Sequence, residues 1–64
     1  MKTAEEILNE LGIKASLGSW KDDNGYHAIC YTRKQGKTWV ALLQEAGYEA
    51  KVVYDTYAYI VIFK

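Results

Sequence analysis

The chain has 64 residues, with eight basic and eight acidic side chains and a formal net charge of zero. A dedicated nucleic-acid binder usually carries a basic excess, because phosphate contacts dominate its affinity, so neutrality argues against that class but leaves room for a local basic patch. Half of the residues are hydrophobic and 14% are aromatic, which excludes disorder. This length indicates one domain, residues 1–64, that buries only about 60% of its unfolded surface.

The cellular location is indicated by three features. The single cysteine, Cys30, excludes an intramolecular disulfide and a cysteine-based zinc site. Acidic residues in MKTAEEILNELG stand where a signal peptide needs an apolar run. No stretch approaches the roughly 18 apolar residues that indicate a membrane-spanning helix. We therefore expect a cytoplasmic protein that does not associate with membranes.

A first helix is predicted over residues 4–11. Thr3, with Glu6 three positions later, forms the capping-box pattern, and Gly12 is a typical helix stop in the left-handed conformation. A first hairpin follows, with strands at 13–20 and 26–33 around Asp22-Asp23-Asn24-Gly25. Asn-Gly is a strong hairpin signal, because both residues tolerate the positive φ of a type I′ turn.

The second half of the chain repeats this order. The polar run Arg33-Lys34-Gln35-Gly36-Lys37 is interpreted as a linker between the halves. A second helix is predicted from Thr38 to Ala46, with Gly47 as its stop. The second hairpin is predicted with strands at 49–55 and 58–63 around Asp55-Thr56-Tyr57, a turn that contains no glycine.

An internal repeat connects the two halves. Residues 3–17 align with residues 38–52, and five positions are identical. The identical pairs are Thr3 with Thr38, Leu8 with Leu43, Glu10 with Glu45, Gly12 with Gly47 and Ala15 with Ala50. We therefore predict an α+β fold in the order α-β-β-α-β-β, with a four-stranded antiparallel sheet, both helices on one face and a possible αββ duplication (half-repeats 3–33 and 38–64).

The last strand is apolar on both faces, although only one face of the sheet can meet the helices. We assign Ile60 and Ile62 to the core, so the other face is predicted to lie open. An open aromatic face indicates a protein interface, because aromatic residues are enriched at such surfaces. The alternative is that the tyrosines simply lie on a solvated sheet. The predicted interface residues are Tyr54, Tyr57, Tyr59, Val61 and Phe63.

The remaining predicted core positions share the apolar stripes of the two helices and the inward side of the strands. They are Ile7, Leu8, Leu11, Ala28, Cys30, Trp39, Leu42, Leu43 and Val52.

A basic cluster precedes the second predicted helix. Arg33, Lys34 and Lys37 could hold a phosphate at free helix amides, while the alternative is a solvated loop capped by Thr38. Gly36-Lys37-Thr38 resembles the end of a P-loop, but Tyr31 stands where that motif needs its first glycine. This cluster, together with sheet tyrosines, gives single-stranded nucleic-acid binding as the alternative function.

No enzymatic, metal or cofactor site is predicted. Asp22 and Asp23 read as turn formers, and no further ligand joins them and His27 at a useful spacing. Cys30 is expected to point into the core, on the opposite side of its strand from His27. Trp20 is either buried by the first hairpin or exposed as a contact residue, and the sequence does not decide between these.

These patterns together predict a small non-enzymatic protein-interaction module, an accessory or inhibitor protein. We expect a homodimer formed through the open aromatic face or through the edge of the last strand. Residues 26–63 resemble sporulation-related peptidoglycan-binding repeats in the order strand, helix ending in Ala-Gly-Tyr, strand, strand. This resemblance concerns the order of elements, and no function is inferred from it.

Overall fold

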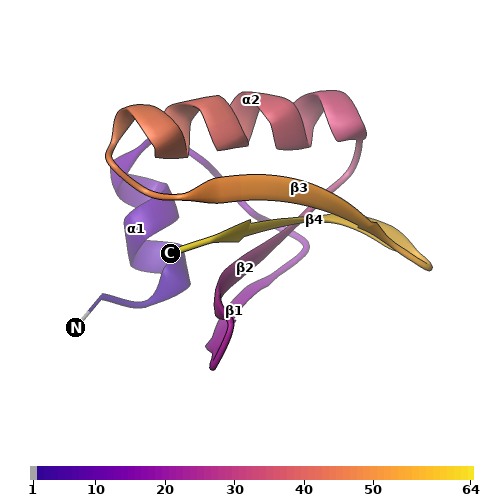
Figure 1. Cartoon of the computed structure of the whole chain (residues 1–64), viewed down its shortest axis with the longest axis horizontal. Coiled ribbons are helices and arrows are strands. Elements are labelled where there is room, and N and C mark those ends of the chain that lie inside the picture. Colours follow the sequence, from indigo (N-terminus) through magenta and orange to yellow (C-terminus); the bar gives the residue numbers. More distant parts are fainter. Residues whose placement is uncertain (1) are drawn as a thin grey trace.

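The computed structural model describes residues 2–64 and has the predicted α+β fold (Figure 1). Two helices and four strands follow one another in the predicted order, α-β-β-α-β-β. The strands form one antiparallel sheet in the order β1-β2-β4-β3. The elements are α1 (Ala4–Glu10), β1 (Ser19–Asp22), β2 (Gly25–Cys30), α2 (Arg33–Glu45), β3 (Ala50–Asp55) and β4 (Ala58–Phe63). No helix among residues 2–64 is both long enough and apolar enough to cross a membrane.

The capping box predicted for α1 is confirmed. The amide of Glu6 donates to Thr3 Oγ1 at 3.1 Å, and the amide of Thr3 donates to Glu6 Oε1 at 3.0 Å. Each bond satisfies an amide that the first helical turn would otherwise leave without a partner. The hydrogen bond from the Thr3 amide to the Glu6 carboxylate lowers the pKa of Glu6, because it favours the ionised form, and the side chain of Thr3 adds to this effect.

The two helices end in the same way, as the alignment of the halves predicts. Gly12 follows α1 with φ 75°, and the amide of Ile13 donates to the carbonyl of Leu8 at 2.9 Å. Gly47 follows α2 with φ 98°, and the amide of Tyr48 donates to the carbonyl of Leu43 at 3.0 Å. Both are Schellman motifs, in which a glycine at positive φ lets the chain turn back over the last helical turn.

The predicted start of the second helix is wrong. The N-cap is Thr32, whose hydroxyl accepts from the amide of Gln35 at 3.0 Å, and the helix begins at Arg33. The polar run predicted as a linker therefore forms the first turns of α2, and β2 ends at Cys30. Thr38 lies inside the helix, where its hydroxyl donates to the carbonyl of Lys34 at 3.1 Å. The two halves thus match at their helix ends and differ at their helix starts.

The first hairpin is shorter than predicted and has a different turn. Asp22 pairs with Gly25, so Asp23 and Asn24 form the loop, and neither has positive φ. A type I′ turn is therefore absent, because its two central residues would need positive φ. The amide of Asn24 donates instead to Asp22 Oδ1 at 2.8 Å. Gly25 has φ 119° and leaves only 2.9 Å between an added Cβ and the carbonyl oxygen of Phe63.

The core lies between the helices and one face of the sheet, and it draws on both helices, β2 and β4. Six of the predicted core residues are buried, and three pack against them as half-buried side chains. The buried six are Ile7, Leu8, Ala28, Cys30, Trp39 and Leu43; the half-buried three are Leu11, Leu42 and Val52.

The assignment of Ile60 and Ile62 to the core is wrong. Val61 and Phe63 are the β4 residues with 0% exposure, while Ile60 and Ile62 lie half-buried on the opposite face. The side of β4 that faces the core therefore contributes the ring of Phe63. This ring stacks on Tyr26 and meets the ring of Tyr48 edge to face.

Candidate functional site

The sheet has one face that neither helix covers, called here the open face. Side chains on one face of antiparallel strands follow from the pairings, since directly paired residues point the same way. One row of the open face contains Trp20, His27, Ile62 and Lys51, and the next contains Ile29, Ile60 and Val53. Five of these seven side chains are apolar, and they are half-buried or, for Trp20, 39% exposed.

Trp20 is a rigid element of the open face. Its ring stacks on His27 with the centroids 4.9 Å apart and the planes 2° from parallel. His27 is 8% exposed, and its Nε2 lies 2.9 Å from Asp22 Oδ1. The hydrogen bond with His27 and a second one from the Asn24 amide hold the pKa of Asp22 below its ordinary value. Trp20 is therefore anchored on one side and exposed on the other.

Cys30 does not join the His27–Asp22 pair. Cys30 lies on the opposite face of β2, where it is 1% exposed, and burial raises the pKa of its thiol. A nucleophile would need the opposite: a depressed pKa and a base within reach. Among residues 2–64, no three His, Cys, Asp or Glu side chains are grouped so that they could hold a metal ion.

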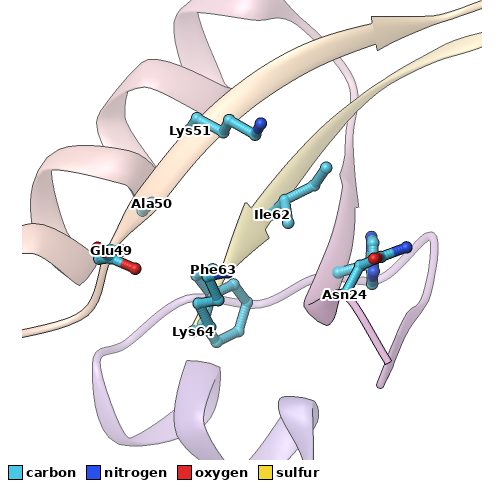
Figure 2. A pocket seen from close by; sticks show the side chains of 8 residues that line it. Asn24, Glu49, Ala50, Lys51, Ile62, Phe63 and Lys64 are labelled. Carbon is cyan, nitrogen blue, oxygen red and sulfur yellow. The ribbon is translucent and has the colours of Figure 1, made fainter. Parts of the chain in front are cut away.

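A hollow of about 470 Å³ lies beside His27, at the end of the sheet. Figure 2 shows it between Asn24 on the β1–β2 turn and Lys51 on β3, with Ile62 of β4 between them. Glu49 and Lys64 border its lower end, so the hollow combines an apolar floor with charged walls of both signs. This mixture resembles the rim of a protein contact more than a pocket for a small ligand.

The residues of the predicted aromatic interface differ in their exposure, and some of them are buried. Val61 and Phe63 are fully buried in the core, so their prediction as interface residues is wrong. Tyr59 is half-buried against the same core. Tyr54 and Tyr57 are 68% and 95% exposed, at the free end of the β3–β4 hairpin. Only this part of the predicted surface is available to a partner.

A second hollow lies next to this hairpin, at the edge of β3. It measures about 320 Å³ and is lined by Arg33, Val52, Val53, Tyr54 and Tyr59. The rings of Tyr54 and Tyr59 pack against each other with centroids 5.0 Å apart. In Figure 1 the tip of the β3–β4 hairpin extends past the first turn of α2.

The basic cluster lies on α2 and not on a loop. Arg33, Lys34 and Lys37 border one shallow surface with Thr38 and Leu42. The amides expected to be free at Gly36-Lys37-Thr38 are inside the helix, and that of Gly36 already donates to the carbonyl of Thr32 at 3.0 Å. The interpretation of Gly36-Lys37-Thr38 as the start of a helix is therefore wrong. The first turn of α2 contains no acidic residue, so its basic residues oppose the helix dipole.

The edges of the sheet are β1 and β3. β4 pairs with β2 on one side and with β3 on the other, so the predicted contact through the edge of the last strand is wrong. The free edge next to it belongs to β3, which has six residues. β1 has four residues and offers a shorter edge.

Comparisons with protein-family models, with curated proteins and with solved structures find no match to this chain. The resemblance of residues 26–63 to sporulation-related repeats therefore rests on the order of the elements alone.

Proposed function

We propose that the chain is a non-enzymatic protein-interaction module, homodimeric and cytoplasmic, that binds an apolar surface of another protein with its open face. The observation that carries this proposal is an apolar sheet face without a covering element. Ile29, Val53, Ile60 and Ile62 form one contiguous cluster on three neighbouring strands. Contiguous apolar patches on small proteins typically mark contact sites.

The composition of the open face supports a protein partner. Its centre is aliphatic, and the charged residues Lys51 and Asp22 stand at its borders, as in interfaces with an apolar core and a polar rim. Trp20 adds a large ring whose position is already fixed by stacking on His27. A preorganised aromatic side chain loses little conformational entropy on binding.

A capture experiment with matched variants tests this proposal. Ile60→Lys places a charge in the centre of the open face, whereas Tyr57→Lys changes a side chain that is 95% exposed at the hairpin tip. We expect a protein from the source cell to bind the wild type and Tyr57→Lys and to be lost with Ile60→Lys. Calorimetry on the purified pair should then give the negative heat-capacity change of apolar burial.

Two results would reject the open face as the contact surface. One is equal capture by wild type and by a folded Ile60→Lys variant. The other is selective loss with Tyr57→Lys, which would move the contact to the hairpin tip. Circular dichroism of both variants must show the wild-type fold for either result to count.

The second candidate function is binding of single-stranded nucleic acid. The observation that favours it is that Arg33 shares a hollow with the exposed Tyr54 and the half-buried Tyr59, because bases stack on aromatic rings beside cationic side chains. Arg33→Ala/Lys34→Ala should abolish binding to a labelled oligonucleotide, and affinity should fall steeply with salt. No binding at low salt would reject this candidate.

A further inference from the structure

We infer that two copies of the chain pair antiparallel through β3, in the register that puts Val53 opposite Val53 of the second copy. The two four-stranded sheets then become one continuous sheet. The inference deepens the proposed homodimer by naming its interface, and it is independent of the proposed contact between the open face and another protein.

The first argument is the free backbone of β3. Glu49 and Lys64 exchange both backbone hydrogen bonds, each 2.9 Å long. Antiparallel pairs alternate between bonded and non-bonded residues, so the groups directed away from β4 belong to Ala50, Val52 and Tyr54. The carbonyl of Ala50 accepts from the side chain of Gln44 at 3.4 Å. Val52 and Tyr54 therefore offer two N–H and two C=O groups to a second strand.

The second argument is that the side chains of β3 are self-complementary. Lys51 and Asp55 lie on the open face, each two residues from Val53. A two-fold axis through Val53 places Lys51 of one copy directly opposite Asp55 of the other, and it does so twice. Opposite charges in such positions stabilise a strand pair. The same register pairs Val52 with Tyr54 of the second copy, and this pair occurs twice by symmetry. Each pair can exchange two backbone hydrogen bonds, which gives four in total.

The neighbouring registers lose this match. A symmetric antiparallel pair can shift only in steps that keep each side chain on its own face. Centring the pair on Val52 places Glu49 opposite Asp55 of the second copy, which sets like charges against each other. Centring it on Tyr54 places Asp55 opposite Val53, which leaves the carboxylate against an apolar neighbour. Charge therefore selects the register through Val53.

The third argument is the hollow beside this edge. In the proposed register, Tyr54 of the second copy lies next to Val52 on the helix side of the sheet. The hollow of about 320 Å³ at that place is lined by Arg33, Val52 and Tyr59, among others. A tyrosine ring that enters it would cover apolar surface and meet a guanidinium group, an arrangement that is attractive within about 6 Å. This accounts for a tyrosine that is 68% exposed in the single chain.

The zero net charge removes general repulsion between copies.

Because the two-fold axis stands perpendicular to the sheet, both open faces point to the same side. The dimer thus presents two copies of the Ile29, Ile60 and Ile62 surface next to each other, which suits a partner protein that is itself a dimer or carries a repeat.

Sedimentation velocity over a concentration series tests the charge register. Lys51→Asp and Asp55→Lys should each weaken dimerisation by about tenfold, because two symmetric attractions become repulsions. The double variant Lys51→Asp/Asp55→Lys should restore the wild-type dissociation constant. Lys21→Asp, on the other edge strand, is the matched control and should leave dimerisation unchanged.

Amide hydrogen exchange on the unmodified chain gives a second readout that does not depend on any variant folding. The amides of Val52 and Tyr54 should become protected only at concentrations that populate the dimer, whereas those of Lys51 and Val53 should be protected throughout. A chain that stays monomeric up to about 1 mM would overturn the inference, as would a double variant weaker than both singles.

A dimer abolished by Ile60→Lys and unaffected by Lys51→Asp would also overturn it, in favour of packing between two open faces. Loss of the captured partner with Ile60→Lys while the dimer persists would support both proposals. Failure of the capture experiment alone would leave the β3 pairing intact.

Discussion

Gly36 allows α2 to lie directly on β3, and replacing it with alanine is the most informative test of this contact. A Cβ added there would lie 2.6 Å from Val52 Cγ2 and 3.0 Å from Cys30 Sγ. Both distances are shorter than carbon and sulfur atoms normally allow. Val52 is branched at Cβ and has few rotamers into which it could move. The helix or the strand must therefore shift.

Two opposing contributions set the expected change in the free energy of unfolding. Alanine stabilises a helix interior by about 1 kcal/mol relative to glycine. An additional methyl group in a filled core costs about 1–3 kcal/mol, and the 2.6 Å approach puts this site toward the upper part of that range. We expect Gly36→Ala to lose about 1–2 kcal/mol in total. For a chain of this size, that corresponds to a Tm lower by about 4–16 °C.

The assay is urea unfolding followed by tryptophan fluorescence, to which the buried Trp39, 7% exposed, and the partly exposed Trp20 both contribute. Protein concentration is kept fixed, because dimerisation would shift the apparent stability. Ala41→Gly, at an exposed position of α2, calibrates the helix-propensity contribution. Val52→Ala combined with Gly36→Ala should cost less than the sum of the two single changes, since removing Cγ2 relieves the overlap. A Gly36→Ala chain more stable than the wild type would refute the close contact.

Three further predictions concern caps and titrating groups. Thr32→Ala should destabilise the fold by about 1 kcal/mol in thermal unfolding, because the amide of Gln35 loses its acceptor; an unchanged Tm would argue against the observed helix start. The pKa of Asp22 is lower in the folded chain, so its contribution is present above the ordinary value of 3.8 and is lost as pH falls through the folded value. Acid titrations of stability should therefore be flatter for Asp22→Asn, and identical curves would contradict this. Burial raises the pKa of Cys30, so a thiol reagent at pH 8 should react with it slowly until urea unfolds the chain; equal rates with and without urea would place it at the surface.

The elements that were predicted well are those with local signals. Thr3, Glu6 and Gly12 define the ends of α1, and Gly47 defines the end of α2, because caps depend on a few neighbouring residues. The second hairpin also lies within a residue of its prediction, since two strands of high β propensity flank the two-residue loop Thr56-Tyr57.

The start of α2 was missed because two threonines compete as caps. Thr38 aligns with Thr3, and the basic residues before it resemble a loop, so the sequence favours Thr38 as the cap. Thr32 is the cap because a helix that begins at Arg33 adds Gly36 to the buried face of Trp39 and Leu43 and places it against β3. Tertiary contact thus overrides the local signal of the second threonine.

The two faces of β4 were exchanged, although the predicted hairpin held the information to assign them. A two-residue loop pairs Lys51 with Ile62 and Val53 with Ile60. Lys51 belongs on the solvent side, so Ile60 and Ile62 belong there too. The face of β4 that is open to a partner is therefore the aliphatic side with Ile60 and Ile62, and not the predicted aromatic side.

The central position of β4 has a consequence for how the chain folds. β2 and β3 touch in the sheet only through β4, and Val61 and Phe63 complete the core beneath both helices. A segment that stops before Ala58 contains one two-stranded hairpin and one unpaired strand, and its helices lack Val61 and Phe63 to pack against. Folding must therefore be cooperative over both halves. Its rate should be limited by closing the loop between β2 and β4, and not by forming either helix.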